Sequence, residues 1–494
     1  MTGKFLDQKM LKVQKPSKDL GFFRFKKLGS QYLLTNDLGE YVFLSENNFT
    51  ELVKRGGQAK IEQLKQLGEK GFLKKGLDEA GFIKRYAAKN RFLRQGPSLH
   101  IIILTLRCNH KCLYCHASAE NLKRTELDMN KTTAKAVVET IFNSPSQDLT
   151  IEFQGGEPLV NWPVLKFIVD YAQKKNKKAG KNLLITIVSN LSLMDKAKLD
   201  WLFKRRVIFC TSLDGPEFLH NKQRIFSDGN SYKNVAEWIR TIRKKYQTIG
   251  YRINALTTIT KHSLPFWKEI VDSYIELGLP TIFLRVLNPF GLAQKTADQI
   301  RYSPQEFIEF YRKSLDYIIE LNLRGKKIRE GYAVITLQKI FGDADPNFLD
   351  LRSPCGAGIG QLAYNFNGDV YTCDEGRMLN RMGDDSFKLG NVLKNSYQEI
   401  VSHQVVKSCC IASTLEGLPE CFNCAYKPYC GTCPVFNYKE QGNIFPQIPN
   451  NERCKIFKGI FDYLFEKLKN KESLKVFHNW LKATTDNKKK LTKT

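Results

Sequence analysis

The stretch LHIIILTLRCNHKCLYC, residues 99–115, joins an apolar run to three closely spaced cysteines, Cys108, Cys112 and Cys115. The run LHIIILT has the length and β-branched content of a buried strand, so the cysteines are predicted to lie in the loop that follows it. Three thiolates in a tight loop can hold three irons of a [4Fe–4S] cluster and leave one iron without a protein ligand. The alternative is a zinc site completed by His110 or His116.

Five further β-rich segments follow this strand, and helix-forming stretches such as KTTAKAVVETIFN and VLKFIVDYAQKKNKK separate them. The six predicted strands cover residues 99–106, 149–155, 182–190, 207–215, 251–260 and 281–289. Strands that alternate with helices predict an α/β fold, here a partial (β/α)6 TIM-like barrel at residues 96–300. In such folds the chemistry lies at the carboxyl ends of the strands.

The rest of the chain divides by composition. Residues 1–95 contain three short strand patterns followed by helical ones, which predicts a small α+β, winged-helix-like module. That shape resembles the peptide-recognition domain attached to many enzymes that modify ribosomally made peptides; the alternative is a purely structural cap. Residues 301–350 are predicted to be a helical linker, and 351–460 form a cysteine-rich, turn-rich domain. Residues 461–494 are predicted to be a C-terminal helix and a basic tail.

Composition narrows the class of protein. The chain of 494 residues has a net charge of +27, but its lysines are scattered, and we find no nucleic-acid-binding motif. No apolar run reaches the length of a membrane span, and the N-terminus lacks the apolar core of a signal peptide. We therefore expect a cytoplasmic protein, with neither a membrane nor a nucleic acid as partner. Thirteen cysteines in such a chain indicate metal or redox chemistry rather than disulfides.

Polar residues follow the second, third and fourth predicted strands. IEFQGGEP contains Gln154, two glycines that allow close backbone approach (Gly155 and Gly156) and Glu157, which can accept hydrogen bonds from an ammonium group. Other candidates lie in VSNLS and SLDGPEFLHNKQR, namely Ser189, Asn190, Ser212, Asp214 and Arg224. Asp214 with Gly215 could also be a plain turn, and Arg224 a surface ion pair.

A second group of cysteines begins at Cys355. CGAGIGQLAYNFNGDVYTC and CFNCAYKPYCGTC contain six of its members, and a seventh follows downstream; these are Cys355, Cys373, Cys421, Cys424, Cys430, Cys433 and Cys454. Pairs spaced as C-x2-C also suit zinc, so the spacing alone leaves iron–sulfur and zinc open.

Taken together, the cysteine triplet, Tyr114 just before its last member, and GGEP one βα unit later resemble the radical S-adenosylmethionine (SAM) superfamily. The resemblance implies that SAM chelates the open iron and is cleaved to a 5′-deoxyadenosyl radical that abstracts hydrogen from a substrate. It also implies a SAM site that includes Tyr114 and Gln154, with the amino group held by the GGEP residues. Ser189 or Asn190 would contact the ribose, and Ser212, Asp214 and Arg224 would contact SAM or frame the substrate. The family often has Asn-Gly where this chain has Asn190-Leu191.

The seven later cysteines resemble the SPASM extension of radical SAM enzymes, which carries two auxiliary [4Fe–4S] clusters. By this resemblance Cys421, Cys424, Cys430 and Cys454 hold one cluster. The other would use Cys355, Cys373 and Cys433, with its fourth site either open to substrate or filled by Cys409 or Cys410. In sulfatase-maturing relatives an aspartate directly after the equivalent of Cys373 is the general base, which makes Asp374 the catalytic candidate ahead of Glu375.

Several longer phrases, among them LHIIILTLRCNHKCLYCHAS and SPCGAGIGQLAYNFNGDVYTCDEGRM, resemble the radical SAM maturase of the His-Xaa-Ser peptide-modification system. That resemblance implies a ribosomally made peptide or small protein as substrate, a possible second radical SAM maturase, and a low-potential electron donor. Two alternatives stay open: an anaerobic sulfatase-type maturase that makes formylglycine, and a zinc-rich nucleic-acid-binding protein.

Overall fold

The computed structural model describes residues 18–246 and 253–492, which fall into two units. The larger unit contains Phe92–Thr336, Asn347–Thr414 and Gly431 onward, and the smaller contains the chain up to Arg91 with Leu337–Pro346 and Leu415–Cys430. The N-terminal residues 1–17, the first two residues of the predicted strand 251–260 and the end of the basic tail lie outside the described residues.

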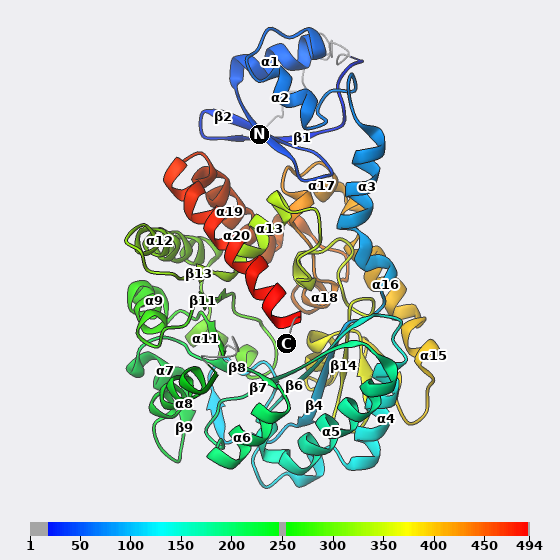
Figure 1. The fold of residues 1–494 in the computed structure, drawn as a ribbon, viewed down its shortest axis with the longest axis vertical. Coiled ribbons are helices and arrows are strands. Elements are labelled where there is room, and N and C mark those ends of the chain that lie inside the picture. Colours follow the sequence, from blue (N-terminus) through cyan, green and yellow to red (C-terminus); the bar gives the residue numbers. More distant parts are fainter. Residues whose placement is uncertain (1–17, 247–252, 493–494) are drawn as a thin grey trace, which may run out of the picture. The chain divides into compact units, whose positions relative to one another are not determined.

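A nine-stranded sheet forms the centre of the larger unit (Figure 1), in the order β12-β10-β8-β7-β6-β4-β14-β15-β16. Seven of its strands are parallel to a neighbour, and six of these lie in the predicted barrel region: β4 Leu99–Thr105, β6 Asp148–Gly155, β7 Asn182–Val188, β8 Ile208–Ser212, β10 Asn254–Thr258 and β12 Leu284–Arg285. They appear in the sheet in sequence order, as successive βα units require. The predicted α/β fold with a partial barrel of parallel strands is confirmed.

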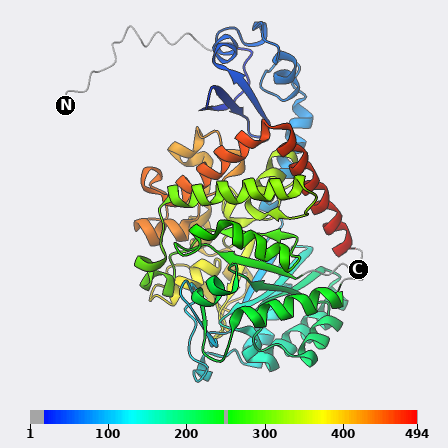
Figure 2. The same ribbon diagram turned by 90° about the vertical axis from the view of Figure 1, so that its left-hand side faces the viewer.

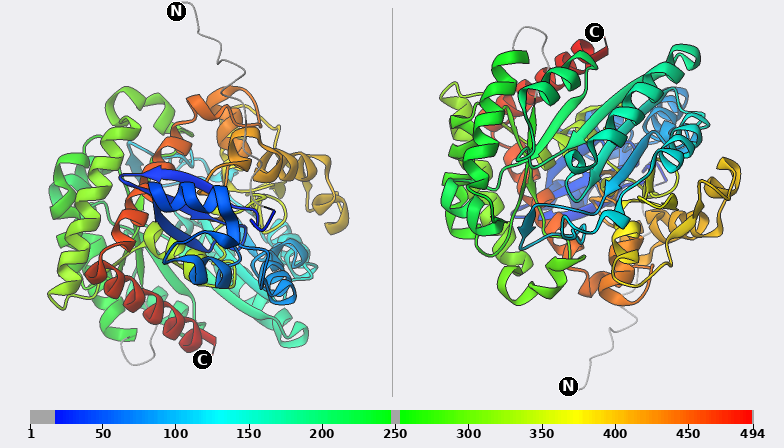
Figure 3. Two further views of the ribbon diagram at one scale, coloured as in Figure 1. Left: turned by 90° about the horizontal axis from the view of Figure 1, so that it is seen from above. Right: turned by 90° about the horizontal axis from the view of Figure 1, so that it is seen from below.

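Helices follow the strands and cover the outside of the sheet; they are α4 Lys131–Phe142, α5 Trp162–Ala179, α6 Lys196–Lys204, α7 Glu217–Gln223, α8 Ser231–Tyr246 and α9 Trp267–Glu276. Helix α4 shows why they form. Asn130 caps its first turn by accepting a hydrogen bond from the Thr133 N–H, and the buried Ala134, Val137 and Ile141 recur at helical spacing. Helices α4 and α5 pack side by side outside the sheet (Figure 3).

The sixth predicted strand, residues 281–289, is wrong as a single element. The chain pairs first as β11 Thr281–Ile282 with β13 Arg329–Glu330, and then as β12 with β10. Between the two pairings the buried Glu330 carboxylate accepts a hydrogen bond from the Leu284 N–H at 3.3 Å. This side chain therefore takes the place of a continuous strand partner.

The other edge of the sheet comes from the second cysteine-rich segment. Strand β14 Gln361–Tyr364 pairs parallel to β4, and β15 Asp369–Tyr371 and β16 Lys388–Asn391 continue antiparallel. Gly368, with φ of 85°, makes the turn between β14 and β15 and donates to the Asn365 carbonyl oxygen at 2.9 Å. The sequence indicated turns here, yet this segment extends the barrel sheet.

Long helices complete the larger unit: α12 Pro304–Leu323, α19 Glu452–Leu468 and α20 Lys471–Thr492. Ser303 and Glu306 form a capping box at the start of α12. Helix α12 packs along α19 (Figure 2), and its apolar face includes the buried Phe307, Tyr311 and Leu315. Within the described residues no helix is both long and apolar enough to span a membrane.

The smaller unit is built on an antiparallel sheet of β1 Arg24–Leu28, β2 Gln31–Thr35 and β3 Tyr41–Ser45, followed by α1 Glu46–Arg55, α2 Leu64–Glu69 and α3 Glu79–Lys89. The predicted order of strands, then helices, is confirmed. A segment from far along the chain joins this unit, because Thr35 Oγ1 donates to the Ala425 carbonyl oxygen at 2.7 Å. The N-terminal strands thus share a unit with residues 415–430, which the sequence places in the separate range 351–460.

Candidate active site

The cysteine triplet lies in the loop after β4, and a short ribbon fixes the loop in place. Strand β5 His110–Cys112 pairs antiparallel with β9 Arg224–Phe226, so that Cys112 lies opposite Arg224. The Leu113 N–H donates to the Gln223 carbonyl oxygen at 2.9 Å. The ribbon therefore connects the loop to the segment after the fourth parallel strand. Strands of three residues have no sequence signal, and the prediction missed them.

The three cysteines are each half-buried, and their thiols lie close enough to interact electrostatically. Burial raises the pKa of the Cys108 thiol, and the thiols of Cys112 and Cys115 raise it further, as does the carboxylate of Glu157. The Cys108 sulfur accepts a hydrogen bond from the His110 N–H at 3.4 Å. Thiols that destabilise one another's charged forms in this way gain from a shared cation. The donor set thus fits a cluster held by three cysteines.

The two glycines at the end of β6, Gly155 and Gly156, contact the backbone that leads into the cysteine loop. Gly155 has φ of 121°, and a Cβ on Gly156 would lie 2.2 Å from the Arg107 carbonyl oxygen. The same carbonyl oxygen accepts a hydrogen bond from the Glu157 N–H at 2.8 Å. Only glycine permits this approach. The backbone contact places Glu157 beside the cysteine loop.

The Glu157 carboxylate is buried and hydrogen-bonded on both oxygens. Its Oε1 accepts from Ser189 Oγ at 2.8 Å and from the Leu159 N–H at 3.0 Å, and its Oε2 accepts from the Asn190 N–H at 2.8 Å. Burial raises its pKa, while these bonds oppose the rise. Oε2 receives one protein hydrogen bond and can accept another, which a ligand ammonium group would supply.

The Asn190 side chain points toward the cysteine loop. Its Nδ2 lies 3.0 Å from Asn109 Oδ1 and 3.8 Å from the Cys108 sulfur. Leu191, which follows it, is buried and has φ of 60°, in the left-handed region that favours glycine. The chain thus keeps a backbone conformation typical of Asn-Gly without the glycine.

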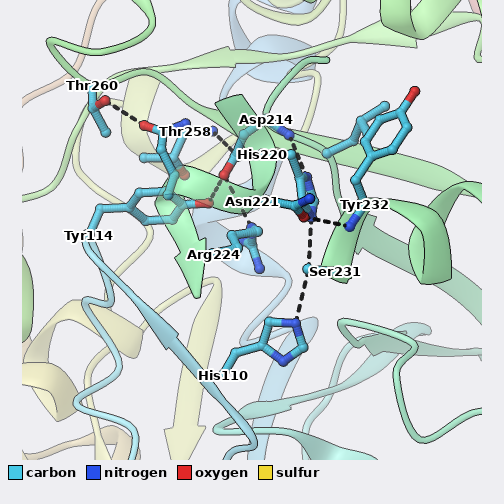
Figure 4. Close-up of polar contacts among 12 residues, drawn as sticks. His110, Tyr114, Asp214, His220, Asn221, Arg224, Ser231, Tyr232, Thr258 and Thr260 are labelled. Atoms are coloured by element: carbon cyan, nitrogen blue, oxygen red, sulfur yellow. Dashed lines mark hydrogen bonds and ion pairs between the residues drawn. The ribbon is translucent and has the colours of Figure 1, made fainter. Parts of the chain in front are cut away.

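Asp214 is fully buried at the centre of a polar network (Figure 4). It accepts a hydrogen bond from the Tyr114 hydroxyl group, another from Arg224 Nε at 3.2 Å and a third from the Thr258 N–H at 3.2 Å. Burial raises the pKa of Asp214, and Arg224 opposes that rise. Three predicted site residues are therefore in mutual contact. Ser212 on β8 lies outside this network.

A chain of hydrogen bonds continues from Asp214 to the cysteine loop (Figure 4). The Asp214 N–H donates to His220 Nδ1 at 3.3 Å, and Ser231 Oγ lies 2.9 Å from Nε2 of both His220 and His110. Burial lowers the pKa of both imidazoles, so both are neutral. His220 Nε2 then carries the proton and donates to Ser231, whose hydroxyl group donates to His110. Sequence reasoning missed Ser231 and His110 in this role because no local pattern connects them.

A cavity of about 680 Å³ runs through the inside of the barrel. Residues of neighbouring strands line it, and on β4 and β6 they alternate, as expected where one face of a sheet points inward; these are Leu99 and Ile101, and Glu152 and Gln154. Gln154 donates to Glu152 Oε1 at 2.6 Å within it. The lining includes His116, directly after Cys115, and Asp374 and Glu375, directly after Cys373.

The cavity also extends from the carboxyl ends of the strands toward their amino ends. In the sheet register Tyr371 of β15 lies opposite Ala363, which lies opposite Ile101 in the first half of β4. Asp374 and Glu375 follow β15 and therefore enter the cavity near the beginning of β4. The predicted carboxyl-end site thus forms only one end of the space.

Cys355, Cys373 and Cys433 are buried in one cluster of the larger unit. Cys373 caps α14 Asp374–Asn380, where its sulfur accepts the Gly376 N–H at 3.4 Å, and Cys433 caps α18 Pro434–Gln441, where its sulfur accepts the Phe436 N–H at 3.4 Å. Backbone N–H groups that point at sulfur stabilise thiolates. These residues fit the thiolate ligands of an iron–sulfur cluster.

Asp374 is held by a buried ion pair. Arg377 Nε donates to Asp374 Oδ1 at 2.7 Å. The neighbouring carboxyl group of Glu375 has its pKa raised to about 7, chiefly by burial and then by Asp350 and Asp374.

The remaining predicted ligands fall in different units. Cys421, Cys424 and Cys430 belong to the smaller unit, and Cys454 lies in the first turn of α19 in the larger one. Their shared cluster stays a prediction.

Comparisons with known proteins agree with this arrangement. Residues 102–265 match the model of the radical SAM superfamily, and residues 355–434 match that of the SPASM iron–sulfur cluster-binding domain. The cysteine-type anaerobic sulfatase-maturating enzyme of Clostridium perfringens (strain 13 / Type A) is 24% identical over 76% of this chain and 98% of its own length. The radical SAM cyclopropyl synthase TigE of Paramaledivibacter caminithermalis is 24% identical over 89% of this chain and 87% of its own length.

Solved structures share the fold. The structure described as native anSMEcpe with bound AdoMet aligns with a TM-score of 0.64 at 20% identity, over 76% of this chain and 99% of that chain. Streptococcus suis SuiB bound to the precursor peptide SuiA aligns with a TM-score of 0.51 at 17% identity, over 88% of this chain and 99% of that chain. The chain therefore combines a radical SAM domain, which implies a [4Fe–4S] cluster and SAM, with a SPASM domain, which implies auxiliary iron–sulfur clusters.

Proposed function

We propose that this radical SAM enzyme installs a crosslink or an oxidation in a ribosomally made peptide or small protein. The observation that carries the proposal is the barrel cavity of about 680 Å³. It connects His116, beside the SAM-cluster cysteines, to Asp374 and Glu375, beside the auxiliary-cluster cysteines. A substrate side chain in this space would contact both ends.

The residues around the cysteine loop would hold SAM. Cys108, Cys112 and Cys115 would ligate the cluster, and Glu157 would accept a hydrogen bond from the SAM ammonium group. With a bound cluster that takes an electron from a low-potential donor and passes it to SAM, the site would supply a 5′-deoxyadenosyl radical for hydrogen abstraction from the substrate. Tyr114, Asp214 and Arg224 would hold the wall of this pocket in a fixed geometry, because each is buried and hydrogen-bonded to another.

Asp374 would remove a proton from the substrate at the other end of the cavity. General-base catalysis requires the carboxylate to lie within hydrogen-bond reach of the proton that it accepts. Arg377 holds one carboxylate oxygen of Asp374 and so fixes its direction. Glu375 lines the same cavity and is the second candidate.

The known relatives support a peptide as substrate. One similar structure contains the Cp18Cys peptide and another contains the precursor peptide SuiA. The phrases shared with the His-Xaa-Ser maturase family favour a peptide of that system as substrate and a second radical SAM maturase as partner. The small α+β unit is the candidate for peptide recognition.

Formylglycine formation is the second candidate function. It is favoured by the similarity to anaerobic sulfatase-maturating enzymes and by Asp374, which follows Cys373 and lines the cavity. A zinc-rich nucleic-acid-binding protein is not supported, because both matched domains are iron–sulfur domains.

Anaerobic purification and metal analysis test whether the protein holds iron–sulfur clusters and cleaves SAM. We expect about twelve irons per chain for three [4Fe–4S] clusters, and release of 5′-deoxyadenosine from SAM with dithionite. Cys112→Ala should abolish that release, and stoichiometric zinc without iron would refute the proposal.

Co-expression with a genome-neighbouring peptide then identifies the product by mass spectrometry: loss of two hydrogens indicates a crosslink or dehydrogenation, and a Ser or Cys converted to an aldehyde indicates formylglycine.

A further inference from the structure

The auxiliary site formed by Cys355, Cys373 and Cys433 has three thiols by sequence pattern, one fewer than a fully ligated [4Fe–4S] cluster needs. A fourth ligand could come from the adjacent Cys409 and Cys410, or an iron could stay open. The sequence does not distinguish these possibilities, but the structure separates the two cysteines.

Cys409 and Cys410 lie on helix α16 Gln404–Ser413 and point in different directions. Residues that lie three or four apart share a helix face, whereas adjacent residues are turned by about 100°. The buried residues of α16 are Val406, Cys409, Ala412 and Ser413. Cys409 is 1% exposed and belongs to the buried cluster that contains Cys355, Cys373 and Cys433. Cys410 is half-buried and lies outside that cluster.

Hydrogen bonds hold this face of α16 against the Cys355 loop. Ser413 Oγ accepts a hydrogen bond from the Cys355 N–H at 2.9 Å and donates to the Cys409 carbonyl oxygen at 2.6 Å. One hydroxyl group therefore bridges the backbones of the two cysteines. This bridge fixes the position of Cys409 relative to the Cys355 ligand.

A glycine allows the loop and helix to approach so closely. Gly358, three residues after Cys355, has φ of 77°, and a Cβ there would lie 2.7 Å from a Val406 methyl carbon. Val406 is one turn before Cys409 on the same face of α16. The loop and the helix are therefore in direct contact on both sides of the Cys409 position.

We infer that Cys409, and not Cys410, is the fourth protein ligand of the auxiliary cluster held by Cys355, Cys373 and Cys433. The cluster then has no iron open to a substrate group, so its role is electron transfer rather than substrate binding. The inference concerns ligation only and does not depend on which peptide is modified.

The test uses a full-length background variant in which Cys108, Cys112 and Cys115 are replaced by Ala, because the SAM cluster itself has an open iron. We expect about eight irons per chain in this background. The electron paramagnetic resonance spectrum of the dithionite-reduced protein should not change when 2-mercaptoethanol is added. This measurement leaves Cys409 intact, so it does not depend on whether a Cys409 variant folds. A spectrum that changes with added thiol would show an open iron and overturn the inference.

Cys409→Ala and Cys410→Ala in the same background form a matched pair. We expect Cys409→Ala either to lose about half of the iron or to keep it and become sensitive to 2-mercaptoethanol. Cys410→Ala should keep the iron content and the thiol-insensitive spectrum of the background. Full iron with an insensitive spectrum in Cys409→Ala, or loss of iron in Cys410→Ala, would refute the assignment.

Discussion

Arg377 Nε donates a hydrogen bond to Asp374 Oδ1 at 2.7 Å, and both side chains are buried. They lie one turn apart on α14, the helix that Cys373 caps. The position of the Asp374 carboxylate is therefore set by the same helix that begins at Cys373. This relationship makes two separable predictions about catalysis.

The first prediction concerns Asp374 as the general base. Asp374→Asn keeps the shape of the side chain and removes its ability to accept a proton, so peptide product should form at least about 10²-fold more slowly. The 5′-deoxyadenosine should still be released, because the residues near Cys108 are unchanged. Chromatography of nucleoside and peptide from one reaction measures both. A wild-type product yield in Asp374→Asn would show that Asp374 is not the general base and would favour Glu375 instead. Glu375→Gln is the matched variant that tests Glu375.

The second prediction concerns Arg377, which positions the Asp374 carboxylate. Arg377→Met should leave Asp374 buried without its partner and lower product formation relative to 5′-deoxyadenosine release. Arg377→Lys restores a positive charge, and we expect it to recover part of the coupling. Equal loss of both readouts in Arg377→Met would indicate general damage to the fold rather than mispositioning.

SAM affinity should depend on the charge of Glu157. Glu157→Gln keeps an oxygen for the Ser189 and Leu159 donors but removes the negative charge near the expected ammonium group. The loss of a charge-assisted hydrogen bond, about 1.5–3 kcal/mol, corresponds to a Kd for SAM raised about 10- to 100-fold. Anaerobic equilibrium binding measures this change. Glu375→Gln, which removes a carboxylate at the other end of the cavity, is the control and should leave the Kd within a few-fold of wild type.

Gly156 should be intolerant of any side chain. The Cβ of Gly156→Ala would lie 2.2 Å from the Arg107 carbonyl oxygen, so the backbone that carries Cys108 has to move. We expect purified Gly156→Ala to hold about eight irons instead of about twelve, because the SAM cluster is lost while the auxiliary clusters stay. Gly417→Ala, at a glycine whose Cβ would have no neighbour within 4 Å, is the control and should keep all the iron. Full iron content in Gly156→Ala would contradict the close packing.

Stability should fall in mild acid because of His100. Its Nδ1 lies 3.1 Å from the Tyr364 hydroxyl oxygen and its Nε2 lies 3.2 Å from the Pro97 carbonyl oxygen. This arrangement suits the neutral ring, with Nε2 as donor and Nδ1 as acceptor. Burial lowers the pKa of His100 from 6.5 to about 3.

The unfolded chain therefore binds a proton at His100 below about pH 6.5, whereas the folded protein does not until about pH 3. The stabilisation is complete above pH 6.5 and decreases as the pH falls, by about 1.4 kcal/mol per pH unit at most. Anaerobic urea unfolding at pH 7.5 and 5.5 measures the difference. His100→Gln keeps both hydrogen-bonding partners without a titratable group and should lose less stability between these pH values. An identical loss would exclude His100 as the cause.

The sequence predicted the elements with strong local patterns. Strands β4, β6, β7 and β8 coincide with apolar, β-branched runs, and α4 and α5 with helical periodicity. Such segments are long enough for side-chain pattern to outweigh context. The cysteine loop and the glycines after β6 could be recognised because the residues required by their chemistry are adjacent in sequence.

Elements that depend on distant partners could not be predicted. Strands β5 and β9 have three residues each and exist only because the loops that contain them meet. The hydrogen-bonded path through His220, Ser231 and His110 joins residues up to 121 positions apart. The choice between Cys409 and Cys410 needed the orientation of α16, which a mixed pattern such as QVVKSCCIAS does not fix.

The pairing of β14 with β4 fixes the distance between two cysteine-containing loops. Because β14 pairs directly with β4, the strand that precedes Cys108 and the hairpin that precedes Cys373 belong to one continuous sheet. The sheet sets the separation of these two cysteines. Cys373 follows the end of β15, which lies beside the first half of β4, and Cys108 follows the carboxyl end of β4. Because the spacing between Cys108 and Cys373 depends on this shared sheet, changes in the loops around the cavity would leave it constant.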